Sequence, residues 1–217
     1  MTKLSDLGFS KDAISETIVT TYSAEGKPNA APMGATIQNP SHLFIKFYNT
    51  SQTFKNVQAT KCAVVNVTSN IDLFYRTAFK EANPNGKLPT EWFNKAQTVN
   101  APKLQTAEAT IETTVSALKP IDTERTQTTL EVKQITAAES LPKAPNRAFA
   151  ATLEAIIHTT RIKAFLKGDE KQKNHVKKLL ETLETCSETV HRTAPNSHYA
   201  EIITDLSKMI AKWRKPQ

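Results

Sequence analysis

Residues 16–37 read ETIVTTYSAEGKPNAAPMGATI, and this stretch carries the clearest signal for the fold. Its first part, residues 16–22, is dense in β-branched side chains, which favour strands, and the following SAEGK contains a glycine that suits a turn. Residues 28–37 continue as a second extended segment that Pro32 and Gly34 interrupt. Because proline donates no ladder hydrogen bond and glycine permits close approach to the backbone, we expect this strand to be irregular, at a sheet edge or against a ligand.

Further strands and short helices follow. Strand-like composition recurs over residues 43–48, 62–68, 108–115 and 128–135. Helical turns are expected over residues 51–60, 71–79 and 91–96. Ser51 is a good N-cap residue for the first of them. Together the six strand-like runs predict a six-stranded antiparallel β-barrel.

The character of the chain changes near Pro142. The segment LPKAPN, residues 141–146, has the composition of a linker, and three amphipathic helices follow it. Their apolar positions are Phe149, Leu153, Ile156, Ile157 and Thr160 in the first helix, Val176, Leu179, Leu180, Leu183 and Cys186 in the second, and Ile202, Ile203, Leu206, Met209, Ile210 and Trp213 in the third. We therefore predict a protein that is mainly β with added α, divided into a barrel domain over residues 1–140 and a C-terminal helical segment over residues 141–217.

The sequence lacks the signals that mark several classes of protein. The N-terminus has no apolar core of a signal peptide, and no run of about 18 apolar residues occurs, so we expect a cytoplasmic protein that does not span a membrane. Cys62 and Cys186 have no partner pattern and the five histidines have no ligand spacing, so neither a disulfide nor a metal site is expected. With 5 glycines and neither GxGxxG nor a Walker motif, the chain does not fit a Rossmann or phosphate-loop nucleotide fold.

Two motifs on either side of one predicted strand suit a ligand. In SQTFKN (residues 51–56), Ser51 and Thr53 place hydroxyls beside unsatisfied backbone N–H groups at the positive end of a helix dipole, which suits a phosphate. In PNAAPMG (residues 28–34), small residues permit a flat ring to lie against the backbone. Each motif also has a plainer interpretation, since Ser51 can be an ordinary helix cap and PNAAPMG a bent edge strand whose small side chains simply pack.

The chain resembles an archaeal-type family of FMN-binding proteins long catalogued as a domain of unknown function. The resemblance rests on these motifs together with LFIKFYNTSQTFKN (residues 43–56) and VVNVT (residues 64–68). Flavin reductases and flavoredoxins are related to that family. Residues 144–162, APNRAFAATLEAIIHTTRI, are similar to its Asn-Arg-Ala, Glu and Ile-His-x-Thr-Arg pattern. The resemblance implies an FMN-binding split β-barrel that forms a homodimer, with FMN at the interface between the two chains.

The resemblance also implies which residues bind FMN. They are Ala31, Pro32, Met33 and Gly34 against the flavin ring, Ser51, Gln52, Thr53 and Asn56 around the phosphate, and the adjoining Tyr48 and Asn49. Relatives often place a basic or imidazole residue between the serine and the threonine, whereas this chain has Gln52. Lys46, Lys55 or an arginine of the partner chain are candidates to neutralise the phosphate instead.

The first of the late helices carries a polar stripe. Glu154, His158 and Arg161 follow one another at spacings of four and three, which puts them on one helix face. The stripe is either an intrahelical ion pair on a solvated face or a set of groups turned towards the flavin or the dimer interface. The sequence leaves both interpretations open.

The function implied by the resemblance is that of an FMN flavoprotein, flavin reductase-like or electron-transferring, with NAD(P)H or another electron donor and with catalysis itself undecided. The alternative is a non-enzymatic nucleic-acid-binding module. The net charge of +7 favours it, because residues 161–217 hold 12 Lys and Arg against 7 Asp and Glu. Aromatic residues make up only 7% and do not alternate with basic residues, which argues against nucleic acid. A homodimer could also cover apolar surface at Phe44, or at Phe74 if that ring is not internal.

Overall fold

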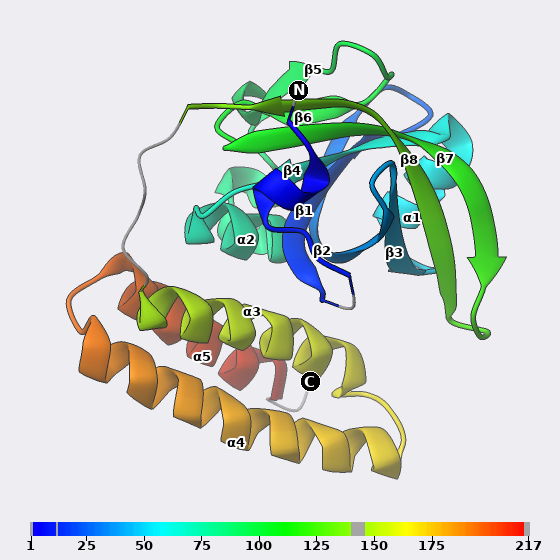
Figure 1. The fold of residues 1–217 in the computed structure, drawn as a ribbon. Helices are drawn as coiled ribbons and strands as arrows, with labels where there is room; N and C mark the ends of the chain where they lie inside the picture. Colours follow the sequence, from blue (N-terminus) through cyan, green and yellow to red (C-terminus); the bar gives the residue numbers. More distant parts are fainter. Residues whose placement is uncertain (1, 12, 140–145, 215–217) are drawn as a thin grey trace. The chain divides into compact units, whose positions relative to one another are not determined.

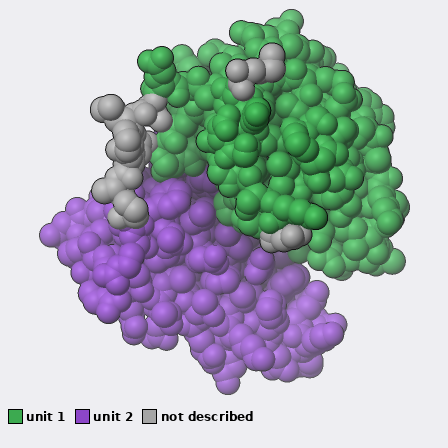
Figure 2. Space-filling view, in the orientation of Figure 1, with its two compact units in different colours: residues 1–69, 79–141 green, residues 70–78, 142–217 purple. Residues whose placement is uncertain are grey.

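The computed structural model describes residues 2–11, 13–139 and 146–214 (Figure 1). The chain forms two compact units (Figure 2). The barrel unit comprises residues 1–69 and 79–141, and the helical unit comprises residues 70–78 and 142–217. The linker predicted over residues 141–146 lies outside the described residues except for its last position.

Six antiparallel strands close into a barrel. They are β1 (Ser15–Tyr22), β2 (Pro28–Asn39), β3 (His42–Tyr48), β4 (Cys62–Val67), β7 (Ala109–Pro120) and β8 (Arg125–Ala137). Their order around the barrel is β1-β2-β3-β8-β7-β4, and every neighbouring pair is antiparallel. The predicted six-stranded antiparallel barrel is confirmed.

The barrel is closed, but β2 and β3 pair over only part of their length, which leaves a local opening in the ladder between them. All of residues 28–35 pair with β1, but the pairing of β2 with β3 begins only at Ala35 opposite Ile45. Residues 28–34 therefore have a strand partner on one side only within the described chain, which suits a segment that contains Pro32. Helix α1 (Gln52–Thr60) contacts β1, β2 and β3 and begins close to this opening.

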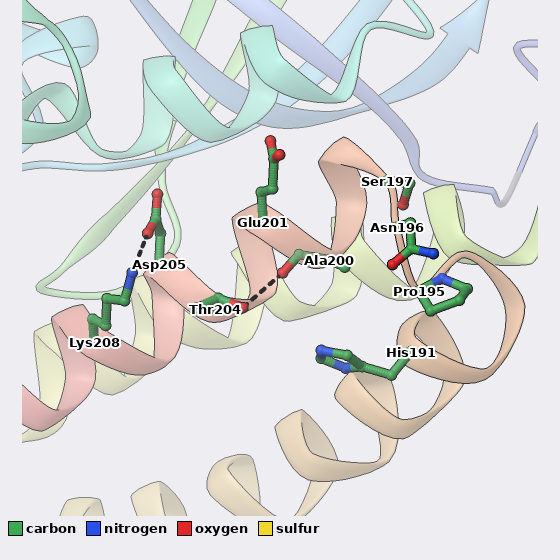
Figure 3. A pocket seen from close by; sticks show the side chains of 9 residues that line it. All are labelled: His191, Pro195, Asn196, Ser197, Ala200, Glu201, Thr204, Asp205 and Lys208. Carbon is green, nitrogen blue, oxygen red and sulfur yellow. Dashed lines mark hydrogen bonds and ion pairs between the residues drawn. The ribbon is translucent and has the colours of Figure 1, made fainter.

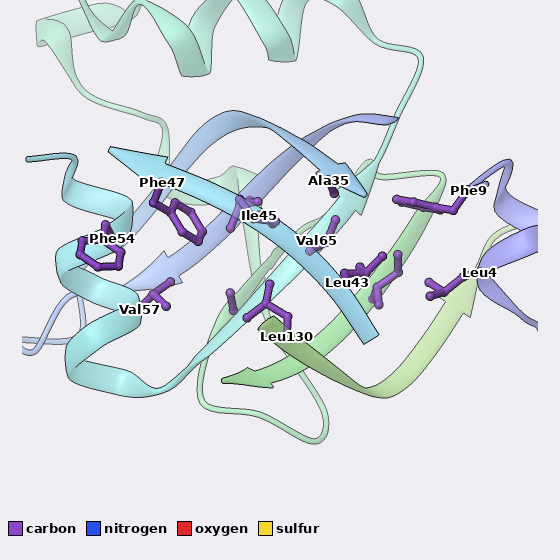
Figure 4. Close-up of a cluster of buried hydrophobic side chains, with 13 residues drawn as sticks. Leu4, Phe9, Ala35, Leu43, Ile45, Phe47, Phe54, Val57, Val65 and Leu130 are labelled. Carbon is purple, nitrogen blue, oxygen red and sulfur yellow. The ribbon is translucent and has the colours of Figure 1, made fainter. Parts of the chain in front are cut away.

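Alternate side chains of the strands fill the barrel (Figure 4). On β3, Leu43, Ile45 and Phe47 are buried, in the period of two that a strand imposes. Helix α1 adds Phe54, whose ring centroid lies 6.0 Å from that of Phe47, and Val57 beside it is also buried. Burying one such side chain contributes about 1.5–3 kcal/mol, so the barrel core also holds α1 in place.

The prediction of a helix over residues 91–96 is wrong. Only the single 3-10 turn η4 (Thr90–Trp92) forms, and β5 (Phe93–Lys95) then pairs with β6 (Pro102–Leu104) in a separate two-stranded sheet. The connecting loop is held by the buried carboxylate of Glu112, which accepts hydrogen bonds from the backbone N–H of Gln97 at 2.9 Å and of Thr98 at 2.6 Å. A six-residue helix has few internal hydrogen bonds, so these long-range contacts decide the conformation.

Short 3-10 turns complete the barrel unit. They are η1 (Leu4–Leu7), η2 (Lys80–Ala82) and η3 (Pro84–Gly86). Leu4 and Phe9, at and after η1, are buried in the barrel core (Figure 4). The N-terminal segment is therefore part of the barrel packing.

The described residues of the helical unit form four helices. They are α2 (Ile71–Ala78), α3 (Arg147–Phe165), α4 (Glu170–Thr193) and α5 (His198–Arg214). Asn146 caps α3 through a hydrogen bond from Ala148 N, and Asp169 caps α4 in a capping box with Gln172. Among the described helices, none combines the length and the apolar character needed to cross a bilayer.

The buried faces of α4 and α5 largely match the predicted apolar positions, but that of α3 does not. Fully buried on α3 are Ala148, Thr152, Ala155, Ile156, Thr159 and Ile162, of which only Ile156 was expected. This helix contacts α2, α4 and α5, so neighbours cover it on several sides. Small side chains permit such close approach, whereas the other predicted positions, Phe149, Leu153, Ile157 and Thr160, are half-buried.

Candidate functional site

The start of α1 has the geometry expected of an anion site. Ser51 is its N-cap, in extended conformation, and its Oγ accepts a hydrogen bond from Phe54 N at 3.2 Å. The hydroxyl hydrogen of Ser51 remains available to a ligand. The backbone N–H groups of Gln52 and Thr53 belong to the first turn, where no helical carbonyl can accept them. Three donors therefore converge at the positive end of the helix dipole.

A buried amide joins the two predicted motifs. Asn29, in the PNAAPMG segment of β2, donates from Nδ2 to Oγ1 of Thr53 at 3.1 Å. Both side chains are buried. Because Thr53 Oγ1 accepts this bond, its own hydrogen is left to donate outward. The structure thus brings the strand motif and the helix motif into direct contact.

Lys80 also belongs to this cluster, although it is not among the residues predicted from the sequence. Its Nζ donates to Oδ1 of Asn29, on the opposite side of the amide from Thr53. Burial lowers the pKa of Lys80, and within the described residues no carboxylate forms an ion pair with it. A half-buried ammonium without a counter-charge is electrostatically costly, and an anion bound beside it would offset that cost.

No local signal could have identified Lys80. It lies 51 residues from Asn29 in a polar, turn-rich segment, and lysines in such segments are usually solvated. The basic group of this cluster thus comes from a part of the barrel unit outside residues 51–56. Lys46 and Lys55, the candidates named from the sequence, are both exposed.

Asn56 and Gln52 form a second layer of the cluster. Asn56 is buried, donates from Nδ2 to Thr21 Oγ1 at 2.9 Å and accepts from Gln52 Nε2 at 2.7 Å. One amide hydrogen of Asn56 is therefore already used to tie α1 to β1. Its direct contact with a phosphate stays a prediction, and its observed contacts position the helix N-terminus.

The PNAAPMG segment provides a surface of suitable shape beside this cluster. Ala31, Pro32, Met33 and Gly34 are half-buried and lie on the part of β2 whose second edge is unpaired. The carbonyl of Met33 accepts a hydrogen bond from Thr17 Oγ1 at 2.8 Å. A Cβ at Gly34 would meet Cγ2 of Ile14 at 2.6 Å, so a larger residue there would displace this exposed side chain.

Tyr48 and Asn49 stand at the end of β3. Tyr48 is 50% exposed. Asn49 is anchored to the β7–β8 connection, because its Nδ2 donates to Thr123 O at 3.1 Å and its Oδ1 accepts from Thr126 Oγ1 at 2.7 Å. Asn49 thus fixes the backbone that leads into Ser51, while Tyr48 is free to meet a ligand or a partner.

The polar stripe of α3 lies in the helical unit. His158 Nε2 is 3.6 Å from Glu154 Oε2, and Arg161 is exposed. Burial lowers the pKa of His158, and Arg161 and His175 lower it further while Glu154 raises it. The intrahelical contact of the plainer interpretation is present, and a role towards flavin or partner stays open.

A hollow of about 680 Å³ lies between the end of α4 and the start of α5 (Figure 3). It is lined by His191, Pro195, Asn196, Ser197, Ala200, Glu201, Thr204, Asp205 and Lys208. Most of its polar groups are already bonded within the unit, for instance Thr204 Oγ1 to Ala200 O at 2.9 Å and Asp205 Oδ1 to Lys208 Nζ at 3.3 Å. We therefore assign it no ligand. No group of three or more His, Cys, Asp or Glu side chains in the described chain could hold a metal ion.

Comparisons with known proteins bear on both units. A model described as protein of unknown function (DUF447), N-terminal domain, matches residues 15–138, and the model described as protein of unknown function (DUF447) matches residues 146–210. No curated protein matches.

Two solved structures are similar to the chain. The crystal structure of an FMN-bound DUF447 protein from Methanosarcina mazei is 25% identical, covers 94% of this chain and 98% of its own, and has a TM-score of 0.75. Nitrilotriacetate monooxygenase component B from Bacillus cereus is 18% identical, covers 61% of this chain and 75% of its own, and has a TM-score of 0.50, which shows a shared fold.

Proposed function

Since the chain belongs to the DUF447 family, whose models match it in both units, we propose that it is an FMN-binding flavoprotein that uses the flavin in redox chemistry. The observation that carries the proposal is the cluster at the start of α1, where Asn29 joins Thr53 to Lys80 beside the N-cap residue Ser51. The FMN-bound family member from Methanosarcina mazei supports the identity of the ligand.

The donors of the cluster fit a phosphate. Ser51 and Thr53 each have a hydroxyl hydrogen to give, the first turn of α1 offers two backbone N–H groups, and Lys80 supplies positive charge. A dianionic phosphate in a partly dehydrated site needs several donors in place of water. A bound phosphate would also favour the charged form of Lys80, whose pKa burial lowers.

The half-open β2 fits a flavin ring. Pro32 and Met33 provide apolar surface, and the unpaired edge of residues 28–34 offers backbone groups to the polar rim of the ring. When bound, FMN supplies the capacity to accept and release electrons, which no side chain of the cluster has. The protein holds the ring, anchors the phosphate and excludes water from the buried amides of Asn29 and Asn56.

We further propose a homodimer that completes the flavin site. Large apolar side chains are exposed at Ile14 (70%), Tyr48 (50%) and Ile121 (45%), all in the barrel unit. Ile14 packs beside Gly34, and Tyr48 adjoins the segment that leads to Ser51, so a second chain that covers them would also border the flavin. Phe74 is internal to its own unit and Phe44 is half-buried, so neither carries this argument. Sedimentation of the FMN-loaded protein tests the dimer, and a monomer with one tightly bound FMN would refute it.

The absorption spectrum of the purified protein tests the main proposal. We expect a flavin absorption band at about 450 nm that NADH, NADPH or another electron donor bleaches in the absence of air. A colourless protein that takes up no FMN would refute it. Salt-sensitive retardation of DNA or RNA by such a colourless protein would favour the nucleic-acid alternative.

A further inference from the structure

Positive charge is concentrated at one end of the helical unit. We call this the basic end and define it by the exposed cations of residues 161–178 and 212–214. They are Arg161, Lys163, Lys167, Lys171, Lys173, Lys177, Lys178, Lys212 and Arg214. Only Asp169 and Glu170 oppose these nine cations, so the basic end has a net formal charge of +7, equal to that of the whole chain.

The fold gathers these residues from three helices. The end of α3 leads into the start of α4 through residues 166–169. Lys163 Nζ of α3 lies 5.0 Å from the ring centroid of Trp213, which places the end of α5 beside the end of α3. Within the described residues, Lys171, Lys177 and Lys178 have no carboxylate within ion-pair distance.

Helix stability does not account for this arrangement. Cations at the ends of α3 and α5 favour those helices because a helix C-terminus is the negative end of its dipole. At the start of α4 the dipole has the opposite sign, and Lys171 and Lys173 lie in or beside its first turn. Lys173 and Lys177 are also like charges at a spacing of four, which is unfavourable. Among the described residues, Glu170 compensates Lys173 at 3.0 Å, whereas Lys171, Lys177 and Lys178 have no such ion pair, and an acidic group outside the chain would compensate them.

We propose that the basic end docks the acidic face of a partner protein. Lysines are compact point charges that suit separated carboxylates and steer a transient encounter at long range. Asp169 and Glu170 lie amid the cations, and a dense row of phosphates would meet them, whereas a protein face can place its carboxylates around them.

Nucleic acid and membrane fit less well. The aromatic side chains nearby already have contacts within the unit. The ring of Trp213 lies under Nζ of Lys163, and the ring centroids of Phe165 and His175 are 5.7 Å apart. They are not offered for stacking on bases. The large hydrophobic side chains exposed in the described chain all belong to the barrel unit, so the basic end has none to insert into a bilayer.

The test compares two charge reversals of equal size on the FMN-loaded protein. One variant combines Lys171→Glu, Lys173→Glu, Lys177→Glu and Lys178→Glu. The matched control combines Lys27→Glu, Lys87→Glu, Lys95→Glu and Lys119→Glu, all at exposed positions of the barrel unit. Binding of a fluorescein-labelled oligoglutamate peptide is followed by anisotropy at low and high salt, with a DNA duplex and phosphatidylserine vesicles as competing probes.

We expect the peptide to bind the parent protein, to weaken with salt, and to lose at least about tenfold in affinity in the first variant but less than about threefold in the control. Equal losses in both variants would overturn the proposal, as would selective dependence of duplex or vesicle binding on the same lysines without an effect on the peptide. If the reversal variant does not fold, Gln at the same four positions replaces Glu. The FMN content of each variant is read separately, so a failure of the flavin proposal is distinguishable from a failure of docking.

Discussion

Lys80→Met tests the assignment of the phosphate site. Methionine keeps much of the length and packing of the lysine and removes the ammonium that donates to Asn29. A charge-assisted hydrogen bond contributes about 1.5–3 kcal/mol, so the loss of Lys80 should raise the Kd for FMN by about tenfold to about 150-fold. Riboflavin, which lacks the phosphate, should bind with an unchanged Kd within about threefold.

Fluorescence titration of the flavin-free protein with FMN and with riboflavin measures both affinities. Lys55→Met is the matched control, because this lysine is exposed on α1 itself and was a candidate from the sequence. Lys80→Arg keeps the charge and should recover most of the affinity for FMN. If FMN and riboflavin weaken equally, or if Lys55→Met has the larger effect on FMN, the assignment of Lys80 to the phosphate is wrong.

The pH dependence of FMN binding provides a second readout of Lys80. Burial lowers its pKa, so its charge is lost at a lower pH than that of an ordinary lysine. Affinity for FMN should therefore fall as the pH rises through this range in the parent protein, and the fall should be absent in Lys80→Met. Identical pH profiles of the two proteins would contradict the reasoning.

Three further outcomes are expected. Replacing Ser51 and Thr53 together by Ala removes two charge-assisted hydrogen bonds of about 1.5–3 kcal/mol each. The affinity for FMN should therefore fall by about two orders of magnitude or more, and the affinity for riboflavin far less, in a fluorescence titration. Gly34→Ala places a Cβ 2.6 Å from a methyl of Ile14, which is 70% exposed and can turn away, so stability in urea unfolding should change by less than about 1 kcal/mol. A larger loss would show that Ile14 is held in place. Hydrogen bonding to Glu201 raises the pKa of His198, so the stabilisation by the charged imidazole is present below its pKa in the unfolded chain and is lost as the pH rises through its pKa in the folded protein. The difference in Tm between the parent protein and His198→Gln should therefore shrink from about pH 6 to about pH 9. A difference that stays constant over this range would refute the prediction.

The sequence predicted the barrel because strand signals are local. The alternation of Leu43, Ile45 and Phe47 is a period of two that the residues display by themselves, and the structure buries all three. The N-cap at Ser51 was equally predictable from the sequence, since N-cap chemistry involves only the next three residues. The failure over residues 91–96 has the complementary cause, because Glu112, from another strand, holds the loop that follows.

Short spacings and ordered motifs predicted the strands, most of the helices, the helix cap that suits a phosphate and the membership of a family. The folded chain was needed to see that Lys80 reaches Asn29 across 51 residues, that Asn56 already gives an amide hydrogen to Thr21, and that α2 groups with the late helices. A lysine or an amide has the same local propensity whether it is solvated or buried. Its role is set by the partner that folding brings to it, and that partner lies beyond the reach of any local pattern.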